Sequence, residues 1–325
     1  MSNQSLFVDL GSCTSRIFEG DRSVFIEPSC VITRQDQIYA IGQKAYDLLG
    51  KEPKSHHLYF PIEHGRIANT QACEWLLSAI SENKVKTPWW QKWLKTPHYA
   101  AISANASNVD RERLKSTLSL VWGGDWKLIN RSQAVLRAIN KKPQISTITL
   151  IIDVGGNVTE LSLFVGEELV RSDQIDWGGV MLTELVQRQI WSIYQSAISW
   201  QTAEHIKREL SLLPTKGSEV RGKLAVRGKH VVNQLGETTI VEAIQLRPAF
   251  EKAVLELVEQ IQQFFAQIPT DLSGSVLESG VILSGGGSLL LGLEQRLATE
   301  LKCPVHTTPS PLVDAIFGLR MMASL

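Results

Sequence analysis

Two short segments of this sequence place an aspartate just before a glycine turn, a combination that can bind phosphate. Each segment follows an apolar run that predicts a strand. A turn of glycine and small hydroxyl residues exposes backbone N–H groups that can cradle an anion. An aspartate at the strand end can hold Mg²⁺ through water, because magnesium favours carboxylate and phosphate oxygens. The candidate residues are Asp9, Gly11, Ser12, Cys13 and Thr14 in the first turn, and Asp153, Gly155, Gly156 and Asn157 in the second.

A third glycine element lies near the end of the chain. The strand-like run Val281–Leu283 leads through Ser284 into Gly285, Gly286 and Gly287, and the pattern predicts an amphipathic helix after them. Contiguous glycines let the backbone approach a ligand closely, and a helix N-terminus favours a phosphate. A dinucleotide-binding fingerprint is disfavoured, because its glycines are spaced apart and belong to the first βαβ unit of a domain.

The elements that must position these turns occur twice. The order of strand, acidic residue, glycine turn and strand runs through Phe7–Phe18 and recurs in Ile151–Phe164. Either turn alone is also typical of an ordinary β-hairpin. The prediction of a phosphate site therefore depends on the occurrence of both turns. A weak internal repeat in a chain of 325 residues predicts two duplicated α/β lobes. A capped helix is expected at Asn108–Leu120, a hairpin at 219–245 and a long helix at Pro248–Gln267.

The composition of the chain argues against several partners and locations. The 33 Lys and Arg residues balance the 33 Asp and Glu residues, so no global field attracts nucleic acid and no nucleic-acid partner is expected. Four cysteines without a paired motif predict reduced thiols in a cytoplasmic protein and argue against a zinc site. The polar N-terminus lacks the features of a signal peptide, and no apolar run is long enough to cross a bilayer.

The three glycine elements, in this order, resemble the two phosphate motifs and the adenosine motif of the actin superfamily. The sequence is most similar to the MreB family of bacterial actins, and the similarity covers nearly the whole chain to Pro311, Leu312 and Gly318. Segments resembling the family in sequence order are Glu27–Ser29, Ala40–Gly42, Phe60–Ile62, Gly65–Ala68, Thr202–Glu204, Val226–Gly228 and Leu289–Leu293.

The resemblance implies an α/β, actin-like ATPase fold, in which two duplicated lobes, each with a core and a smaller subdomain, surround a nucleotide cleft. Lobe I would take 1–140, with its core at about 1–26 and 80–140, a smaller subdomain at about 27–79, and completion by 308–325. Lobe II would take 141–307, with its core at about 141–177 and 244–307 and a smaller subdomain at about 178–243.

The resemblance also implies ATP or GTP as the ligand, with Mg²⁺ facing Asp9 and Asp153 through water. Gly285, Gly286 and Gly287 would lie against the nucleotide. Glu204 and Lys207, three residues apart on one predicted helix, would approach the adenosine side. Their alternative role is an exposed ion pair within that helix.

Departures from the family pattern concentrate where hydrolysis would occur. Arg131 stands in the slot of a glutamate that orients the attacking water, and Val158 replaces a threonine associated with hydrolysis. Asn157 replaces a glycine, while Val180 and Thr183 stand where the family has aspartates.

A guanidinium cannot accept a proton from water, but it can bind phosphate oxygens or occupy part of the space of a metal. We therefore predict slow or absent hydrolysis, with no catalytic residue assigned. In the alternative register, shifted by two residues, Gln133 would substitute as the water-positioning group and hydrolysis would be normal.

A segment rich in tryptophan and lysine, residues 84–97, predicts contact with a membrane. Thr87 and Pro88 would start a single helical turn. Its apolar face would carry Trp89, Trp90, Trp93 and Leu94, and Lys92 and Lys95 would point away. Aromatic rings at headgroup level and lysines near anionic lipid are typical of an interfacial anchor. The position matches a membrane-inserting loop of the family; the alternative is that these tryptophans pack onto the lobe.

Three functions follow from this resemblance. The first is a cytoskeletal protein that forms head-to-tail filaments with itself, peripheral on the inner face of the plasma membrane, setting cell shape and organising wall synthesis with membrane proteins of those processes. The second is a degenerate, non-hydrolysing partner that co-assembles with or caps an active MreB filament. The third, a chaperone ATPase or sugar kinase, is disfavoured because neither a substrate domain nor a catalytic acid motif is found.

Overall fold

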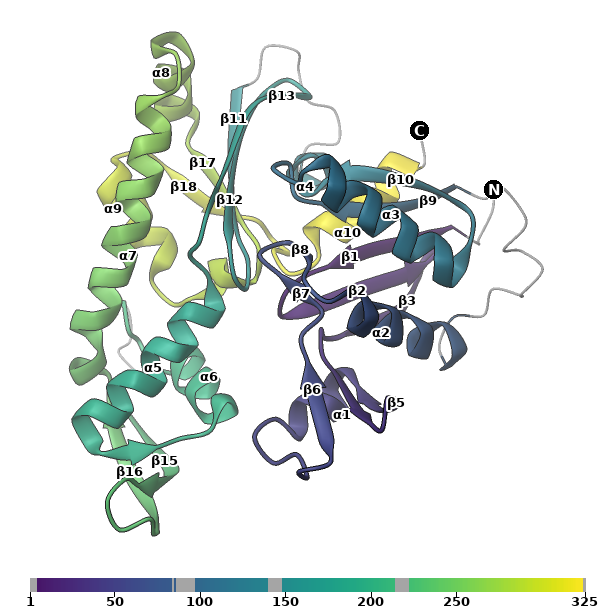
Figure 1. Ribbon diagram of the computed structural model, residues 1–325. Helices are drawn as coiled ribbons and strands as arrows, with labels where there is room; N and C mark the ends of the chain where they lie inside the picture. Colours follow the sequence, from purple (N-terminus) through teal and green to yellow (C-terminus); the bar gives the residue numbers. More distant parts are fainter. Residues whose placement is uncertain (1–4, 84, 86–96, 140–147, 214–221, 324–325) are drawn as a thin grey trace.

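The computed structural model describes residues 5–83, 85, 97–139, 148–213 and 222–323, and its first half is built on a five-stranded sheet (Figure 1). The strand order is β10-β9-β1-β2-β3. β1 (Leu6–Leu10), β2 (Thr14–Glu19) and β3 (Arg22–Pro28) form an antiparallel meander, and β9 (Pro97–Ile102) and β10 (Asp125–Asn130) add in parallel. Every residue of β1 is buried, as expected for a central strand covered on both faces.

The second half repeats this plan. Its sheet has the order β13-β12-β11-β17-β18. β11 (Ile148–Val154), β12 (Thr159–Val165) and β13 (Glu168–Ile175) form the antiparallel meander, and β17 (Val281–Ser284) and β18 (Val305–Thr307) add in parallel. The duplication predicted from the two aspartate-glycine turns is therefore confirmed at the level of sheet topology.

Each half also carries a small three-stranded sheet at its far end. One has the order β5-β4-β6, from β4 (Val31–Arg34), β5 (Gln37–Ile41) and β6 (His56–Tyr59), beside helix α1 (Gly42–Asp47). The other has the order β14-β15-β16, from β14 (Ser196–Ala197), β15 (Lys223–His230) and β16 (Gly236–Glu242). The hairpin predicted at 219–245 is confirmed by β15 and β16. A short ribbon, β7 (Ile62–Glu63) and β8 (Arg66–Ile67), lies between β6 and the first large sheet (Figure 1).

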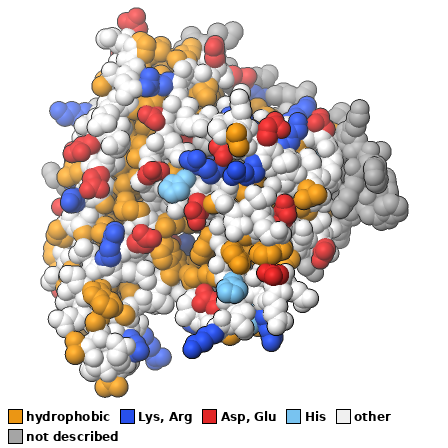
Figure 2. Space-filling view, in the orientation of Figure 1, with side chains coloured by type: hydrophobic (Ala, Val, Ile, Leu, Met, Phe, Trp, Pro, Cys, Tyr) orange, Lys and Arg blue, Asp and Glu red, His pale blue; other side chains and the backbone are white. Residues whose placement is uncertain are grey.

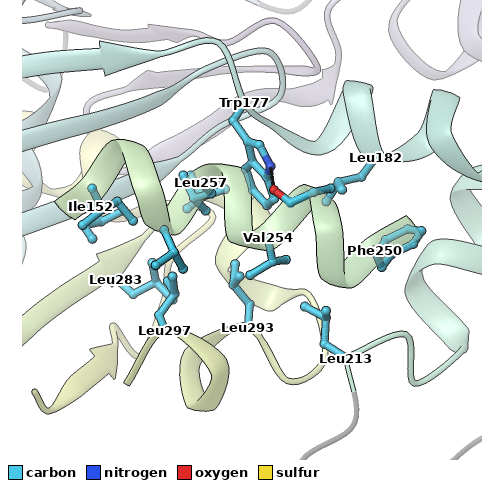
Figure 3. Packing of buried hydrophobic residues seen from close by; sticks show 14 of the residues in the cluster. Ile152, Trp177, Leu182, Leu213, Phe250, Val254, Leu257, Leu283, Leu293 and Leu297 are labelled. Atoms are coloured by element: carbon cyan, nitrogen blue, oxygen red, sulfur yellow. Dashed lines mark hydrogen bonds between the residues drawn. The ribbon is translucent and has the colours of Figure 1, made fainter. Parts of the chain in front are cut away.

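Helix α7 (Ala243–Ala266) forms most of one wall of the second core (Figure 3). Its buried residues Phe250, Val254, Leu257, Ile261 and Phe264 recur every three or four positions, which places them on one face. The helix begins five residues before the predicted Pro248, because its apolar face continues back through Ala243 and Leu246. Pro248 therefore lies inside the helix, where it removes one backbone hydrogen bond.

Further helices pack against the large and the small sheets of the two halves (Figure 1). The first half has α2 (Thr70–Asn83) and α3 (Asn108–Trp122), and the second has α5 (Gly179–Tyr194), α6 (Trp200–Glu209), α8 (Thr270–Ser279) and α9 (Leu293–Leu301). α3 begins where the sequence predicted a polar cap, with a reciprocal capping box between Ser107 and Asp110.

Two helices lie between the large sheets and join the halves. α4 (Arg131–Ile139) and α10 (Asp314–Ala323) pack so closely that a Cβ on Gly318 would lie 1.7 Å from the carbonyl oxygen of Ala134. Ala134 and Ile316 belong to a cluster with Phe7 of the first sheet. Their neighbours on the same helices pack against Ile151 of the second sheet. The C-terminal helix therefore contributes to the core of both halves.

One predicted element differs from the structure. The glycine triplet leads into a short 3₁₀ turn, Gly286–Leu289, and α9 begins only at Leu293. The apolar residues Leu289–Leu291 predicted a continuous helix, but the chain needs a left-handed residue at Gly292 to re-enter the core beneath Leu213. The favourable end of the helix is thus several residues away from the glycines.

The tryptophan segment predicted to contact a membrane lies largely outside the described residues. Trp89, Trp90, Lys92, Trp93, Leu94 and Lys95 all fall within 86–96. In the part of the chain that the structure describes, no helix is long and apolar enough to cross a membrane.

Candidate functional site

The two predicted glycine turns have the same internal structure. The N–H of Gly11 donates to the carbonyl of Thr14 at 3.2 Å, and the N–H of Gly155 donates to that of Val158 at 2.9 Å. The strand register is also equivalent, because Asp9 pairs with Arg16 and Asp153 pairs with Glu160. The duplicated turns therefore present matching backbone, and the residues opposite the two aspartates differ in charge.

The two turns meet at the junction of the halves. A Cβ built on Gly156 would lie 2.5 Å from Sγ of Cys13 and 3.3 Å from its backbone nitrogen. A side chain at this position would therefore force Cys13 to shift. Ser29, at the end of β3, braces the first turn by donating its hydroxyl to the carbonyl of Gly11 at 2.5 Å. The convergence required for one ligand to reach both turns is thus present.

Arg131, the first residue of α4, is the central cation of the site. Its Nε and Nη2 donate to Oδ1 of Asp9 at 3.1 and 2.9 Å, and Nη2 also donates to the carbonyl of Leu10 at 3.2 Å. The third nitrogen, Nη1, lies 3.9 Å from Oε1 of Glu160 in the other half. Burial opposes the charge, but Asp9, Glu160 and Asp153 outweigh it and raise the pKa of the guanidinium.

Two buried acids of the second half face this cation. Glu160 is 2% exposed, and neither of its carboxylate oxygens has a hydrogen-bond partner among the described residues. Burial raises the pKa of Asp153 to about 7; Arg131 opposes that shift, and Glu160 and Asp9 add to it. Asp9 and Asp153 therefore belong to one electrostatic cluster, although they come from different halves.

These residues fit a magnesium ion poorly. Oδ1 of Asp9 already accepts two hydrogen bonds from Arg131, and Oδ2 lies 3.6 Å from Nη1 of Arg16. Both oxygens of the predicted ligand thus face permanent cations, next to which a divalent ion would be repelled. Among the described residues, no group of three or more His, Cys, Asp and Glu side chains is placed to hold a metal.

The glycine triplet packs against the end of β11, directly beside Asp153. Gly285 has a left-handed φ of 80°, and a Cβ there would lie 2.2 Å from Oδ1 of Asp153. A Cβ on Gly287 would lie 2.2 Å from Cγ1 of Val154. The structure therefore brings the third glycine element next to the second turn.

Glu204 and Lys207 do not form an exposed pair, because Lys207 is buried. Its Nζ contacts Glu204 at 2.6 Å and donates to the carbonyl of Gly179 and the hydroxyl of Thr183, both at 2.9 Å. Burial raises the pKa of Glu204, but Lys207 and its hydrogen bonds prevail and lower it. The cluster fixes α6 to the first turn of α5.

That first turn of α5 is in turn bonded to the second glycine turn. The N–H groups of Gly179 and Val180 donate to the carbonyls of Gly155 and Gly156 at 3.1 and 2.8 Å. Glu204 and Lys207 therefore hold the first turn of α5, and α5 in turn holds the second glycine turn.

Sequence reasoning missed two residues of the charged cluster, Arg16 and Glu160. The repeated sequence could have identified both residues. In a two-stranded hairpin, Arg16 lies opposite Asp9 and Glu160 lies opposite Asp153. Arg131 reaches Asp9 from the first position of α4. Val158 is buried and presents only its carbonyl to the turn.

Known proteins are similar to this chain over nearly its whole length. The family model described as MreB/Mbl protein matches residues 3–324. The cell shape-determining protein Mbl of Bacillus subtilis (strain 168) is 25% identical over 99% of this chain and 96% of its own length. The cell shape-determining protein MreB of Escherichia coli (strain K12) is 26% identical over 98% of this chain and 92% of its own.

Solved structures match in fold. MreB5 of Spiroplasma citri bound to AMPPNP superimposes with a TM-score of 0.90 at 22% identity, covering 98% of this chain and 96% of that one. A MamK double helical filament subunit gives a TM-score of 0.80 at 17% identity, covering 99% of each chain. The sheets and helices described above are thus an actin-like fold, and the chain belongs to the MreB/Mbl family.

Proposed function

We propose that this chain binds a nucleoside polyphosphate, ATP or GTP, between its two glycine turns. The observation that carries this proposal is the contact of Cys13 with Gly156, which brings two matching sets of turn N–H groups to one place. The similar MreB5 structure binds AMPPNP. The predicted lobe boundaries belong to the same proposal, with the cleft between lobe I and lobe II.

A pair of glycine variants tests the binding site. Gly156→Ala places a methyl group against Cys13 and should weaken binding of a fluorescent ATP analogue by about tenfold, the equivalent of roughly 1.4 kcal/mol. The matched control is Gly236→Ala, since a Cβ at that position meets no atom within 4 Å. Equal affinity of the two variants for the ATP analogue would show that the glycine turns do not bind the nucleotide.

Hydrolysis in this proposal is slow or absent. Arg131 is fixed on Asp9 and cannot accept a proton from water, so no water-orienting acid stands at that position. Phosphate release should be about 10²-fold or more below that of an active relative assayed in parallel. A normal rate in the wild-type protein would show that Gln133 or another group orients the water.

We propose further that the protein assembles head to tail into filaments that help to set cell shape. The support is its family, whose relatives are named cell shape-determining proteins, and the fold shared with a MamK filament subunit. Sedimentation with ATP and with a non-hydrolysable analogue tests it. Pelleting in both conditions is expected, because assembly would not depend on hydrolysis.

The charged cluster also favours a second candidate, a non-hydrolysing partner of an active MreB. A buried arginine in place of an acid is the expected signature of such a partner. In this case the protein would stay in the supernatant alone and would pellet, or shorten filaments, when mixed with an active relative. Sedimentation of the mixture therefore separates the two candidates.

Membrane association remains a prediction from the sequence of residues 84–97. The triple variant Trp89→Ser, Trp90→Ser and Trp93→Ser should lose flotation with anionic liposomes, because interfacial aromatic rings are removed. Variant Trp191→Ser is a matched control, since Trp191 is 53% exposed on α5. Undiminished flotation of the triple variant would exclude this anchor.

A further inference from the structure

We propose that Arg131 takes the place of the divalent cation, so that this protein binds its nucleotide without magnesium. The inference rests on the proposed nucleotide site and names Arg131 as the positive charge that balances the phosphates there. Arg131 stems from α4, at the junction of the two sheets, and reaches acids of both halves: Asp9 directly and Glu160 at 3.9 Å.

The first argument is that the cation position is already filled. A water-bridged magnesium ion needs carboxylate oxygens that are free to accept hydrogen bonds from its waters. In this site, Arg131 donates twice to one oxygen of Asp9, and Arg16 lies 3.6 Å from the other. Both are guanidinium groups, which stay protonated at any physiological pH. A magnesium ion would have to displace a charge that cannot be neutralised.

The second argument is that Arg131 retains a donor for phosphate. Its hydrogen bonds all leave from Nε and Nη2, so within the described residues Nη1 is not hydrogen-bonded. A guanidinium held by a carboxylate on one edge offers its remaining N–H groups in a fixed direction, which suits phosphate oxygens. The 13% of the side chain that is exposed shows that solvent reaches it.

The third argument is the fixed orientation of the side chain. Three hydrogen bonds to Asp9 and Leu10 hold Arg131 before any ligand binds. Glu160, buried and without a hydrogen-bond partner in the described part of the chain, attracts the Nη1 end toward the second half. The counter-charge is thus built into the fold, and its position does not depend on the metal concentration.

The decisive experiment uses the wild-type protein. Affinity for ATP is measured by calorimetry in excess EDTA and in excess Mg²⁺. The expected result is a Kd that weakens by less than about tenfold on chelation, that is by less than about 1.4 kcal/mol. A loss of tenfold or more in EDTA would overturn the inference while leaving the nucleotide site intact. Absence of binding in both conditions would instead refute the proposed function.

Variants at Arg131 then assign the effect to this residue. Arg131→Glu restores a carboxylate at this position, and its binding should vanish in EDTA and return with Mg²⁺. Arg137→Gln, on the same helix but paired with the exposed Glu167, should behave as the wild type in both conditions. Equal metal dependence of Arg131→Glu and the wild type would overturn the inference.

Loss of Arg131 leaves three buried acids, so thermal unfolding is recorded for each variant. If Arg131→Glu does not fold, Arg131→Lys is used in its place. Lysine keeps the charge without the planar fork, so binding should weaken several-fold and should remain indifferent to EDTA. A magnesium requirement in Arg131→Lys and in the wild type alike would contradict the proposal.

Discussion

Arg131 is the residue that balances the charges where the two halves meet. Its guanidinium neutralises Asp9 and faces Glu160 in a site where burial makes an unpaired charge costly. An acid at this position would add a fourth carboxyl group to Asp9, Asp153 and Glu160, a cluster that needs a metal to be stable. The arginine therefore stabilises these buried acids, and in the proposed function it leaves no acid at this position to orient water.

His98, a second buried ionisable residue, gives the protein a predicted sensitivity to acid. It is 4% exposed and accepts a hydrogen bond from the N–H of Leu6 at Nδ1, 3.0 Å away. Burial lowers the pKa of His98 from 6.5 to about 4, with Asp125 opposing the shift. The pKa of His98 is lower in the folded protein than in the unfolded chain. Its contribution to the free energy of unfolding is therefore fully present above pH 6.5 and is lost as the pH falls toward 4.

Lowering the pH from 7 to 5 should therefore reduce the free energy of unfolding by about 2 kcal/mol through this histidine. His98→Asn retains an acceptor near the Nδ1 position and cannot be protonated. Its urea midpoint should therefore shift less than that of the wild type over this pH range. Equal shifts in the two proteins would mean that other groups control the acid response.

At the scale of elements, helices α4 and α10 decide how the two sheets are joined. They contact residues of both sheets, and Arg131 is the first residue of α4, so their packing also sets the position of the site. At Gly318 they pack so closely that an added Cβ would meet the backbone of Ala134. Any side chain at this position must separate the helices.

Gly318→Ala should thus destabilise the protein by at least about 2 kcal/mol, because its methyl group would meet the backbone of Ala134. Gly274→Ala, also inside a helix, meets no atom within 4 Å and should stabilise by about 0.5–1 kcal/mol. Thermal unfolding of the two variants measures the difference. Similar melting temperatures would contradict the packing described for α10.

At the scale of the whole molecule, the halves also touch outside the charged cluster. Gln201 on α6 donates to the carbonyl of Tyr46, in the last turn of α1, at 2.9 Å and to that of Leu49, just after α1, at 3.4 Å. His64 pairs with Asp176, and Ser172 donates to Asn105. Figure 2 shows a notch between the lower ends of the halves, with acidic and basic side chains interspersed over the face. These polar contacts add to the apolar packing of α4 and α10, which joins the two halves.

Gln201→Ala should therefore loosen the closed form and speed release of the nucleotide. Loss of hydrogen bonds worth roughly 1 kcal/mol predicts a rise in the off-rate of about fivefold in a chase with unlabelled ATP. Gln187→Ala is the control, because Gln187 donates to Ile198 within one half. An unchanged off-rate in Gln201→Ala would show that this contact does not limit release.

The amino-acid sequence by itself determined the duplicated plan and the three glycine elements. Both are local properties, since an apolar run ending in an aspartate and a glycine turn has the same meaning wherever it occurs. The capped start of α3 and the β15–β16 hairpin were predictable for the same reason. The notable charge substitution, Arg131, was also visible in the chain.

Only the tertiary structure decided what these residues do together. The contact between Cys13 and Gly156, and the encounter of Arg131 with Asp9 and Glu160, join positions far apart in sequence and depend on how α4 sits between the sheets. The burial of Lys207 likewise depends on α5 packing against α6, which helical spacing cannot reveal. Pairing and burial are properties of the packed core, so the counter-charge of this site could be assigned only after folding was known.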